Sequence, residues 1–389
     1  MYISRIKLQN WKNFQSVDVA VTTRCFIVGA NAAGKSNLLD AFRFLHDLVR
    51  VGGGLQVAVK ERGGFTKIRC LAARVHKDVL VEVVLSDSAS QKAQWSYRLS
   101  FKHTGGGIID NAVEITCEQV RNEATGEIIL SRDGNSEKGD KEALKYTHLE
   151  QISSNKKFRE IKDFFAAISY QNILPQLVRE SGYSGFTSGD DHYGRDFLQR
   201  LSRLNEPTKK SYLSKISEVL QEAVPQLSEL TYEKSADSVP HLKARYKHWR
   251  AQGSWQQETQ FSDGTIRLIG FMFALLDNKD GVVLLEEPET NLHSAVVAKL
   301  PAFISKIQRT GSRKCQVIIT THSYDILTDA GIAGEETLLL MPSREGTEVT
   351  AVSDDLQMRT ELEAGASIAD CVMHLTAPDQ VDNIMNVSF

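Results

Sequence analysis

The sequence predicts an α/β protein with a mixed, mainly parallel sheet, interrupted by a long insertion of strands and helices. Three observations lead to this fold class. Short apolar runs towards both ends of the chain are typical of buried parallel strands, and helical stripes lie between them. A glycine-rich junction joins one such strand to a helix at residues 29–36. Residues 78–132 alternate apolar and polar side chains, which indicates an antiparallel sheet.

Residues 1–75 are expected to form the N-terminal part of the core. The alternating stretches "YISRIKLQ" and "SVDVAV" predict two strands, and the apolar "CFIVG" predicts a buried third strand. The next segment, residues 35–49, places its apolar side chains at helical spacing. They are Leu38, Leu39, Phe42, Leu45, Leu48 and Val49.

Residues 76–255 are expected to be an insertion of two kinds of structure. Its first part holds the alternating stretches "VLVEVVLS", "WSYRLSF", "AVEITCEQV" and "EIILS", separated by turn residues. Residues 155–225 follow a mainly helical pattern with a glycine-rich break, and residues 228–250 look extended. We therefore expect an antiparallel sheet followed by a helical region.

Residues 256–389 are expected to complete the core. The helical pattern "TIRLIGFMFALL" precedes the buried strand "GVVLLEE", and "AVVAKLPAFISKIQ" precedes the buried strand "CQVIITTHS". Alternation of helices with buried strands is the pattern of a parallel α/β sheet. Because the same pattern surrounds "CFIVG", both ends of the chain are expected to share one sheet.

The composition of the chain indicates the cellular location of the protein more clearly than its activity. With 46 Lys and Arg against 49 Asp and Glu, the net charge is -3, which does not indicate a nucleic-acid partner, although a local patch could still bind one. The five cysteines form no C-x-x-C pair, so a reducing cytoplasm is the simplest setting. The apolar runs are too short to span a membrane, and no signal core opens the chain.

The glycine-rich junction carries the strongest chemical signal. "GANAAGKS" fits the pattern G-x-x-x-x-G-K-[ST] between a buried strand and a helix, the context that indicates a phosphate-binding P-loop. Backbone N–H groups there point at phosphate oxygens, the Lys35 ammonium reaches the β and γ phosphates, and the Ser36 hydroxyl binds Mg²⁺. The expected ATP-binding residues are Gly29, Ala30, Asn31, Ala32, Ala33, Gly34, Lys35, Ser36 and Asn37.

The stretch "VVLLEEPETNLH" places two carboxylates at the end of a buried strand. Ligands collect at this end of parallel strands. Adjacent side chains on a strand point to opposite sides, so the two carboxylates need separate roles. We expect Glu286 to bind Mg²⁺ together with Ser36, and Glu287 to polarise the water that attacks the γ-phosphate.

A third buried strand ends in "TTHS". We expect its histidine, His322, to contact the γ-phosphate or the attacking water and so sense the terminal phosphate. A histidine in this position is more often structural, so the functional assignment depends on the order of all the motifs along the chain. A fourth stretch, "FSDGT" at residues 261–265, contains no obvious catalytic side chain.

In that order the motifs resemble those of the ABC-type ATPases, within the soluble RecF/SMC/OLD-like branch, a group of P-loop NTPases. The stretches that carry the resemblance are "GANAAGKSN", "FSDGTIRL", "LLEEPETNLH" and "TTHS", supported by "LQNWKNFQ" near the N-terminus. The resemblance implies an ABC-type ATPase core with an N-terminal antiparallel β-subdomain, ATP and Mg²⁺ as cofactors, and an ATP-dependent homodimer or higher even oligomer. The chain after His322 is too short for the TOPRIM nuclease domain of OLD-like proteins.

The resemblance also implies roles for residues outside the P-loop. Ser262 and Gly264 would contact ATP held by the opposite subunit, and the helix after them would point its positive end at that nucleotide. Asn291 and His293 would lie at the dimer interface. A glutamine-loop residue is not assigned, since the context of Gln56 is not distinctive.

Three functions are compatible with these motifs. The first is an ATPase that acts as sensor or switch in bacterial anti-phage defence or genome maintenance, with a separately encoded effector such as a nuclease. The second is a RecF- or SMC-like repair ATPase that clamps DNA with its insertion. The third is a transporter subunit, which the insertion and the "FSDGT" motif argue against.

Three other stretches look functional but have simpler explanations. Residues 188–196, "SGDDHYGRD", resemble a metal site but fit a surface loop. The segment "HLKARYKHWR" could bind phosphates, although a solvated charged face is the base expectation. Asp354 and Asp355 resemble only part of a nuclease acid cluster.

Overall fold

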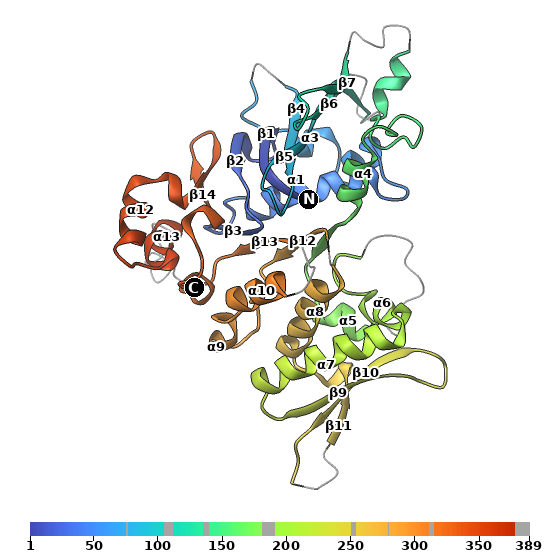
Figure 1. Ribbon diagram of the computed structural model, residues 1–389, viewed down its shortest axis with the longest axis vertical. Helices are drawn as coiled ribbons and strands as arrows, with labels where there is room; N and C mark the ends of the chain where they lie inside the picture. Colours follow the sequence, from blue (N-terminus) through green and yellow to red (C-terminus); the bar gives the residue numbers. More distant parts are fainter. Residues whose placement is uncertain are drawn as a thin grey trace, which may run out of the picture.

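A computed structural model describes residues 1–74, 77–104, 112–134, 140–180, 191–249, 254–278, 280–310 and 315–377. Three sheets organise the described chain, two of six strands and one of three. The N-terminal six-stranded sheet lies towards one end of the molecule, the central six-stranded sheet lies in the middle, and the three-stranded sheet lies at the opposite end (Figure 1). No helix in these ranges is long and apolar enough to cross a membrane.

The N-terminal sheet is antiparallel throughout and has the order β2-β1-β4-β5-β6-β7. Every second side chain of its longer strands is buried, which is the pattern that the sequence shows. The expected boundary between residues 75 and 76 runs through this sheet, because β1 pairs with β4 along most of its length. The strands are β1 Tyr2–Trp11, β2 Phe14–Ala20, β4 Val79–Ser86, β5 Ala93–His103, β6 Val113–Asn122 and β7 Ile128–Asp133.

The central sheet has the order β15-β14-β3-β13-β12-β8, and all its pairs are parallel except β14–β15. Its middle strands are apolar runs buried on both faces, as the sequence predicts. Two findings go beyond the sequence reading: the short β8 reaches this sheet from within the expected insertion, and β14 and β15 extend its other edge. The strands are β3 Arg24–Gly29, β8 Ile168–Gln171, β12 Val282–Glu286, β13 Gln316–Thr321, β14 Thr337–Ser343 and β15 Gly346–Ala351.

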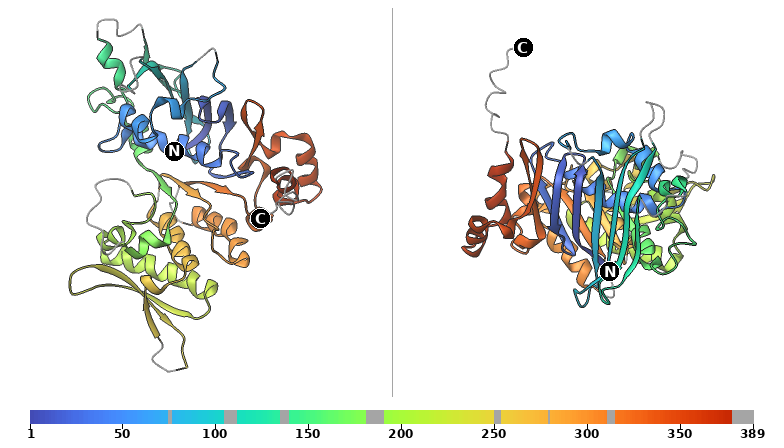
Figure 2. Two further views of the ribbon diagram at one scale, coloured as in Figure 1. Left: turned by 180° about the vertical axis from the view of Figure 1, so that it is seen from behind. Right: turned by 90° about the horizontal axis from the view of Figure 1, so that it is seen from above.

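Helix α1, Lys35–Val49, fills the space between the two large sheets. Its apolar side chains join one core with the inner face of the N-terminal sheet and with one face of the central sheet. A second core covers the other face of the central sheet with α8, Asp263–Asp277, α10, Leu300–Arg309, and α13, Ile368–Thr376. The central sheet is therefore buried on both faces (Figures 1 and 2).

The rest of the expected insertion forms a helical lobe. Helix α7, Glu206–Ala223, packs on α8 and on the three-stranded sheet, which has the order β11-β10-β9. This lobe lies on the side of the central sheet away from the N-terminal sheet in both views of the long axis (Figures 1 and 2). Its other elements are α5 Pro175–Glu180, α6 Phe197–Arg203, β9 Leu227–Lys234, β10 Pro240–Tyr246 and β11 Ser254–Gln257.

The remaining helices are short and connect the larger elements. They are α2 Leu55–Glu61, α3 Phe65–Ile68, α4 Arg159–Ala166, α9 Ser294–Val297, α11 Tyr324–Leu327 and α12 Leu356–Glu363.

Candidate ATP site at the carboxyl edge of the central sheet

The glycine-rich junction turns from β3 into α1 through backbone conformations that glycine favours. Gly34 precedes the first residue of α1 with a φ of 101°, and Ala32 also has a positive φ, 63°. A side chain at position 34 would overlap the side chain of Asn13. The Asn13 amide donates to the Ala33 carbonyl at 3.0 Å and accepts from Asn37 at 2.8 Å. Asn13, within the "LQNWKNFQ" stretch, therefore holds the loop although the sequence reading gave it no role.

Lys35 is buried beneath this loop. Its ammonium donates to the carbonyls of Gly29, at 2.9 Å, and Ala30, at 3.2 Å. Burial lowers the pKa of Lys35, and the negative charges of Glu287, Glu289 and Glu286 oppose that shift. The ammonium thus lies within the field of three carboxylates, where an added phosphate would meet it.

Ser36 and Glu286, predicted to share one metal, are in direct contact. The Ser36 hydroxyl donates to Glu286 Oε1. The other oxygen, Oε2, accepts from the Tyr170 hydroxyl and from the Asn172 amide at 3.3 Å. Mg²⁺ is commonly held by one or two oxygen ligands of the protein, with phosphates and waters completing its shell. The hydroxyl–carboxylate pair fits that requirement.

Tyr170 and Asn172 were missed by the sequence reading. Tyr170 lies in β8 and Asn172 directly follows it, and a four-residue strand has too weak a pattern to be recognised in sequence. Arg43 of α1 lies over the Tyr170 ring, 5.4 Å from its centroid. Burial, followed by the hydrogen bond to Glu286 and its charge, raises the pKa of Tyr170, so its hydroxyl remains a hydrogen-bond donor. Gln56 lies elsewhere and bonds to Val113 and Lys145 in the N-terminal lobe.

Replacing Tyr170 with Phe is expected to weaken Mg²⁺ activation of the protein about 10- to 100-fold, because the loss of a partner that orients a metal ligand has effects of that size. The measurement is phosphate release from ATP as a function of Mg²⁺ concentration. Tyr97→Phe is the matched control, since it removes another tyrosine hydroxyl from a carboxylate, Glu118, within the N-terminal lobe. Equal Mg²⁺ dependence in all three proteins would remove Tyr170 from the site.

Glu287 and His322 meet at the ends of the neighbouring strands β12 and β13. His322 Nδ1 lies 3.2 Å from Glu287 Oε1, and both side chains are partly exposed. Glu287 has a φ of 42°, an uncommon conformation for a residue other than glycine. Its N–H is bonded to the Thr320 carbonyl at 3.1 Å, so the turn after β12 is tied to β13. A water between this pair and a phosphate above Lys35 would have a carboxylate acceptor within reach.

Two further charged groups lie near this pair and were not singled out by sequence. Glu289 is buried, and Arg267 on α8 is half-buried, with an Nε atom that has no hydrogen-bond partner in the described chain. Burial lowers the pKa of Arg267 against the charges of Asp263, Glu287 and Glu289. Helix α8 therefore places a cation beside the carboxylates that follow β12.

The residues expected to act on a second subunit have structural roles within their own chain. Ser262 is the N-cap of α8, and its Oγ accepts from Thr265 N at 3.2 Å. Gly264 packs so closely against the turn after β12 that a Cβ would overlap the Asn291 carbonyl oxygen. Asn291 has a φ of 65°, and His293 Nδ1 accepts from Ala295 N at 3.1 Å to cap α9. Their contacts across a dimer stay predictions.

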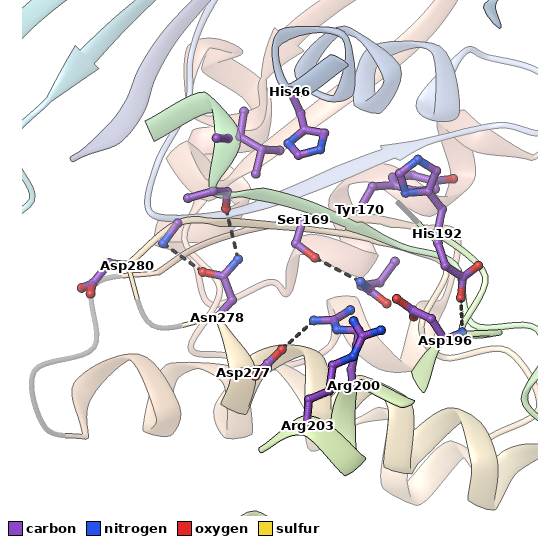
Figure 3. A pocket seen from close by; sticks show the side chains of 16 residues that line it. His46, Ser169, Tyr170, His192, Asp196, Arg200, Arg203, Asp277, Asn278 and Asp280 are labelled. Atoms are coloured by element: carbon purple, nitrogen blue, oxygen red, sulfur yellow. Dashed lines mark hydrogen bonds and ion pairs between the residues drawn. The ribbon is translucent and has the colours of Figure 1, made fainter. Parts of the chain in front are cut away.

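A cavity of about 590 Å³ runs along β8, at the edge of the central sheet (Figure 3). Tyr170 and His192 border it at one end, with ring centroids 5.3 Å apart. On α6 the Arg200 side chain is paired with Asp277 at 2.6 Å. Burial raises the pKa of Asp196 to about 6, against the charge of Arg200.

Three stretches that look functional in the sequence are residues 188–196, residues 241–250, and Asp354 with Asp355. Where the structure describes them, they make local contacts. Residues 188–190 lie outside the described ranges, and Asp191 accepts from the N–H groups of Tyr193 and Asp196. In the described ranges no three His, Cys, Asp or Glu residues form a metal cluster. Lys243 on β10 pairs with Glu233, and Asp355 caps α12.

Comparisons with known proteins identify the family and the fold of the chain. Residues 25–329 match the family model described as "AAA domain, putative AbiEii toxin, Type IV TA system", and residues 3–46 match the P-loop-containing region of the AAA domain. Among solved structures, an SMC head bound to the C-terminal winged-helix domain of ScpA superposes with a TM-score of 0.50 at 15% identity, covering 92% of this chain and 100% of that one. The SMC head of Thermotoga maritima gives 0.48 at 15% identity, covering 90% and 99%. The comparison with curated proteins gave no match.

Proposed function

The chain belongs to the AbiEii-type AAA-domain family of P-loop ATPases, and on that premise we propose that it is a Mg²⁺-dependent ATPase that dimerises around ATP and works as a sensor or switch. The observation that carries the proposal is that a buried lysine and two pairs of side chains lie together at one edge of the central sheet. Lys35 lies under the phosphate loop, Ser36 contacts Glu286, and Glu287 contacts His322.

Each group has a chemical role in this proposal. Backbone N–H groups of residues 29–36 and the Lys35 ammonium bind the phosphates. Ser36 and Glu286 would hold Mg²⁺, which supplies positive charge to the phosphate oxygens when it is bound. Glu287 accepts a proton from the attacking water, and His322 fixes the orientation of the Glu287 carboxylate.

The switch role and the separate effector rest on the resemblance to the soluble RecF/SMC/OLD-like ATPases and not on individual residues. The matching family model is described by a putative toxin of a Type IV toxin–antitoxin system, which supports a partner protein. We propose on this basis a role in bacterial anti-phage defence or genome maintenance, with a separate effector such as a nuclease. A cytoplasmic location is supported by the five free cysteines, four of which are buried.

A DNA-clamping function remains a second candidate because of one further observation. The lining of a cavity of about 1060 Å³ on the N-terminal sheet contains one acid, Asp78, and four cations, Arg69, Lys77, Arg98 and Lys102. Clustered cations of this kind suit a phosphate backbone. An ATP-dependent shift of plain duplex DNA that weakens with salt would favour this function, and co-purification with a neighbouring gene product without DNA binding would favour the switch.

The test of the ATPase proposal is a nucleotide-binding and turnover measurement on the purified protein. Lys35→Ala is expected to weaken ATP binding roughly 10- to 100-fold, because a hydrogen bond to a charged group contributes about 1.5–3 kcal/mol. Lys60→Ala, on the exposed side of α2, is the matched control and is expected to bind as the wild type does. ATP binding that is unchanged in Lys35→Ala would contradict the assignment of the site.

A further inference from the structure

Glu289 is a buried carboxyl group for which the ATPase chemistry outlined above has no use. Its side chain follows Glu287 by two residues and is 7% exposed. One oxygen, Oε1, accepts from the Thr321 hydroxyl at 2.6 Å, and the other has no hydrogen-bond partner in the described chain. A buried carboxyl oxygen without a partner costs stability, so the group is expected to have a specific role.

Thr321 connects this carboxyl to the residues around His322. Its hydroxyl donates its single proton to Glu289 and accepts from the Ser323 N–H at 3.0 Å. Since the proton is committed to Glu289, the oxygen lone pairs are directed at Ser323. The hydroxyl thereby closes a small turn with His322 at its centre, and Ser323 is the N-cap of α11.

The His322 side chain makes few contacts of its own in the described chain. Its side chain is about half exposed, and the hydrogen bond described for it is the one to Glu287 at 3.2 Å. The direction of the ring therefore depends on the backbone turn that carries it. That turn is fixed through Thr321 to a residue on the same loop as Glu287.

We propose that Glu289 and Thr321 are positioning residues that set His322 against Glu287. The loop after β12 is joined to the end of β13 and to the residue that follows it at three places: Glu287 N–H to Thr320, Glu289 to Thr321, and Glu287 to His322. The first two contacts fix the third. The inference rests on the proposed function, because it assigns the two residues to the hydrolysis that Glu287 and His322 perform.

The experiment compares turnover and ATP affinity in Thr321→Val, which keeps the shape of the side chain and removes its hydroxyl. The turnover rate is expected to fall about 10-fold, the effect of one well-placed hydrogen bond, with ATP affinity unchanged. Thr321→Ser restores the hydroxyl and is expected to restore turnover to within about 3-fold. Glu289→Gln keeps an acceptor oxygen for Thr321 and is expected to behave like Thr321→Ser, whereas Glu289→Ala is expected to behave like Thr321→Val.

A double-mutant cycle separates positioning from a general structural effect. In a His322→Ala background, Thr321→Val is expected to lower turnover no further, because the residue it positions has gone. An equal 10-fold loss in both backgrounds would overturn the proposal, as would wild-type turnover in Thr321→Val. If Thr321→Val does not fold, the same cycle with Glu289→Ala decides. A loss in Glu289→Gln as large as in Glu289→Ala would assign the effect to charge and would also overturn it.

The proposed function and the positioning role of Glu289 and Thr321 can be refuted separately. A wild-type protein that does not hydrolyse ATP would refute the proposed function. A wild-type protein that hydrolyses ATP, while the losses from Thr321→Val and His322→Ala multiply, would refute only the positioning role.

Discussion

Glu287→Gln is expected to bind ATP with wild-type affinity and to lose hydrolysis by about 10²- to 10⁴-fold, the usual contribution of a positioned general base. The amide has the shape of the carboxylate and still reaches His322, but it cannot accept a proton from water. The measurements are phosphate release and equilibrium ATP binding. In the presence of ATP, size-exclusion chromatography is expected to show a dimer, because the ATP-bound dimer opens only after hydrolysis.

The same substitution leaves the left-handed backbone at Glu287 in place, so it isolates the effect of the carboxylate. Glutamine has the same backbone preferences as glutamate, so the conformation at φ 42° is retained in the variant. Glu127→Gln, in the exposed turn before β7, is the control for the loss of one charge. Normal hydrolysis in Glu287→Gln would show that another group activates the water.

The residues that the sequence could predict are those whose positions follow from a single local segment. A strand, a glycine-rich turn and a helix are consecutive, so residues 29–36 specify the phosphate loop by themselves. Glu286, Glu287 and His322 end two apolar strands, and parallel strands bring their carboxyl ends to one edge. The expected sharing of one metal by Ser36 and Glu286 agrees with that rule, and the rule also accounts for the contact between Glu287 and His322, which was not expected.

The residues that the sequence could not predict depend on pairing between distant segments. Tyr170 reaches Glu286 only because β8, from within the expected insertion, pairs with β12. Asn13 reaches the phosphate loop because the turn after β1 folds back over it. Likewise, β1 pairs with β4 across the expected domain boundary. No periodicity within a segment encodes such pairings, since register and partner are set by the assembled core.

The residues of the "FSDGT" motif can serve both the fold of their own chain and the ATP site of a second subunit. Ser262 is needed in its own chain as a helix cap, and Gly264 is needed because the Asn291 carbonyl lies against it. Both requirements place the start of α8 firmly beside the loop that follows Glu287. A helix N-terminus fixed in this way presents its N–H groups and positive dipole end in a defined direction, which a phosphate on a second subunit could use. The intrachain roles therefore do not replace the proposed contact across the dimer.

Mixing two inactive variants tests whether Ser262 acts only within its own chain or also at the nucleotide of the opposite subunit. Ser262→Arg and Lys35→Ala are each expected to abolish most ATP hydrolysis. If Ser262 serves the nucleotide of the opposite subunit, a heterodimer of the two contains one site with both halves intact. Random mixing in equal amounts is then expected to restore about a quarter of the wild-type rate, since half of the dimers are mixed and each has one working site of two.

The control for this experiment separates capping from contact with the nucleotide. Ser367 caps α13 as Ser262 caps α8, and Ser367→Arg removes a cap without touching the site. A lost cap costs about 1 kcal/mol of stability, so Ser367→Arg is expected to melt at a lower temperature and to keep its ATPase activity. Mixed dimers of Ser262→Arg and Lys35→Ala that form but stay inactive would assign Ser262 to its own chain alone. Recovery would show that the cap of α8 also completes the ATP site of a partner, because no rearrangement within one subunit can combine an intact Lys35 with an intact Ser262 in that mixture.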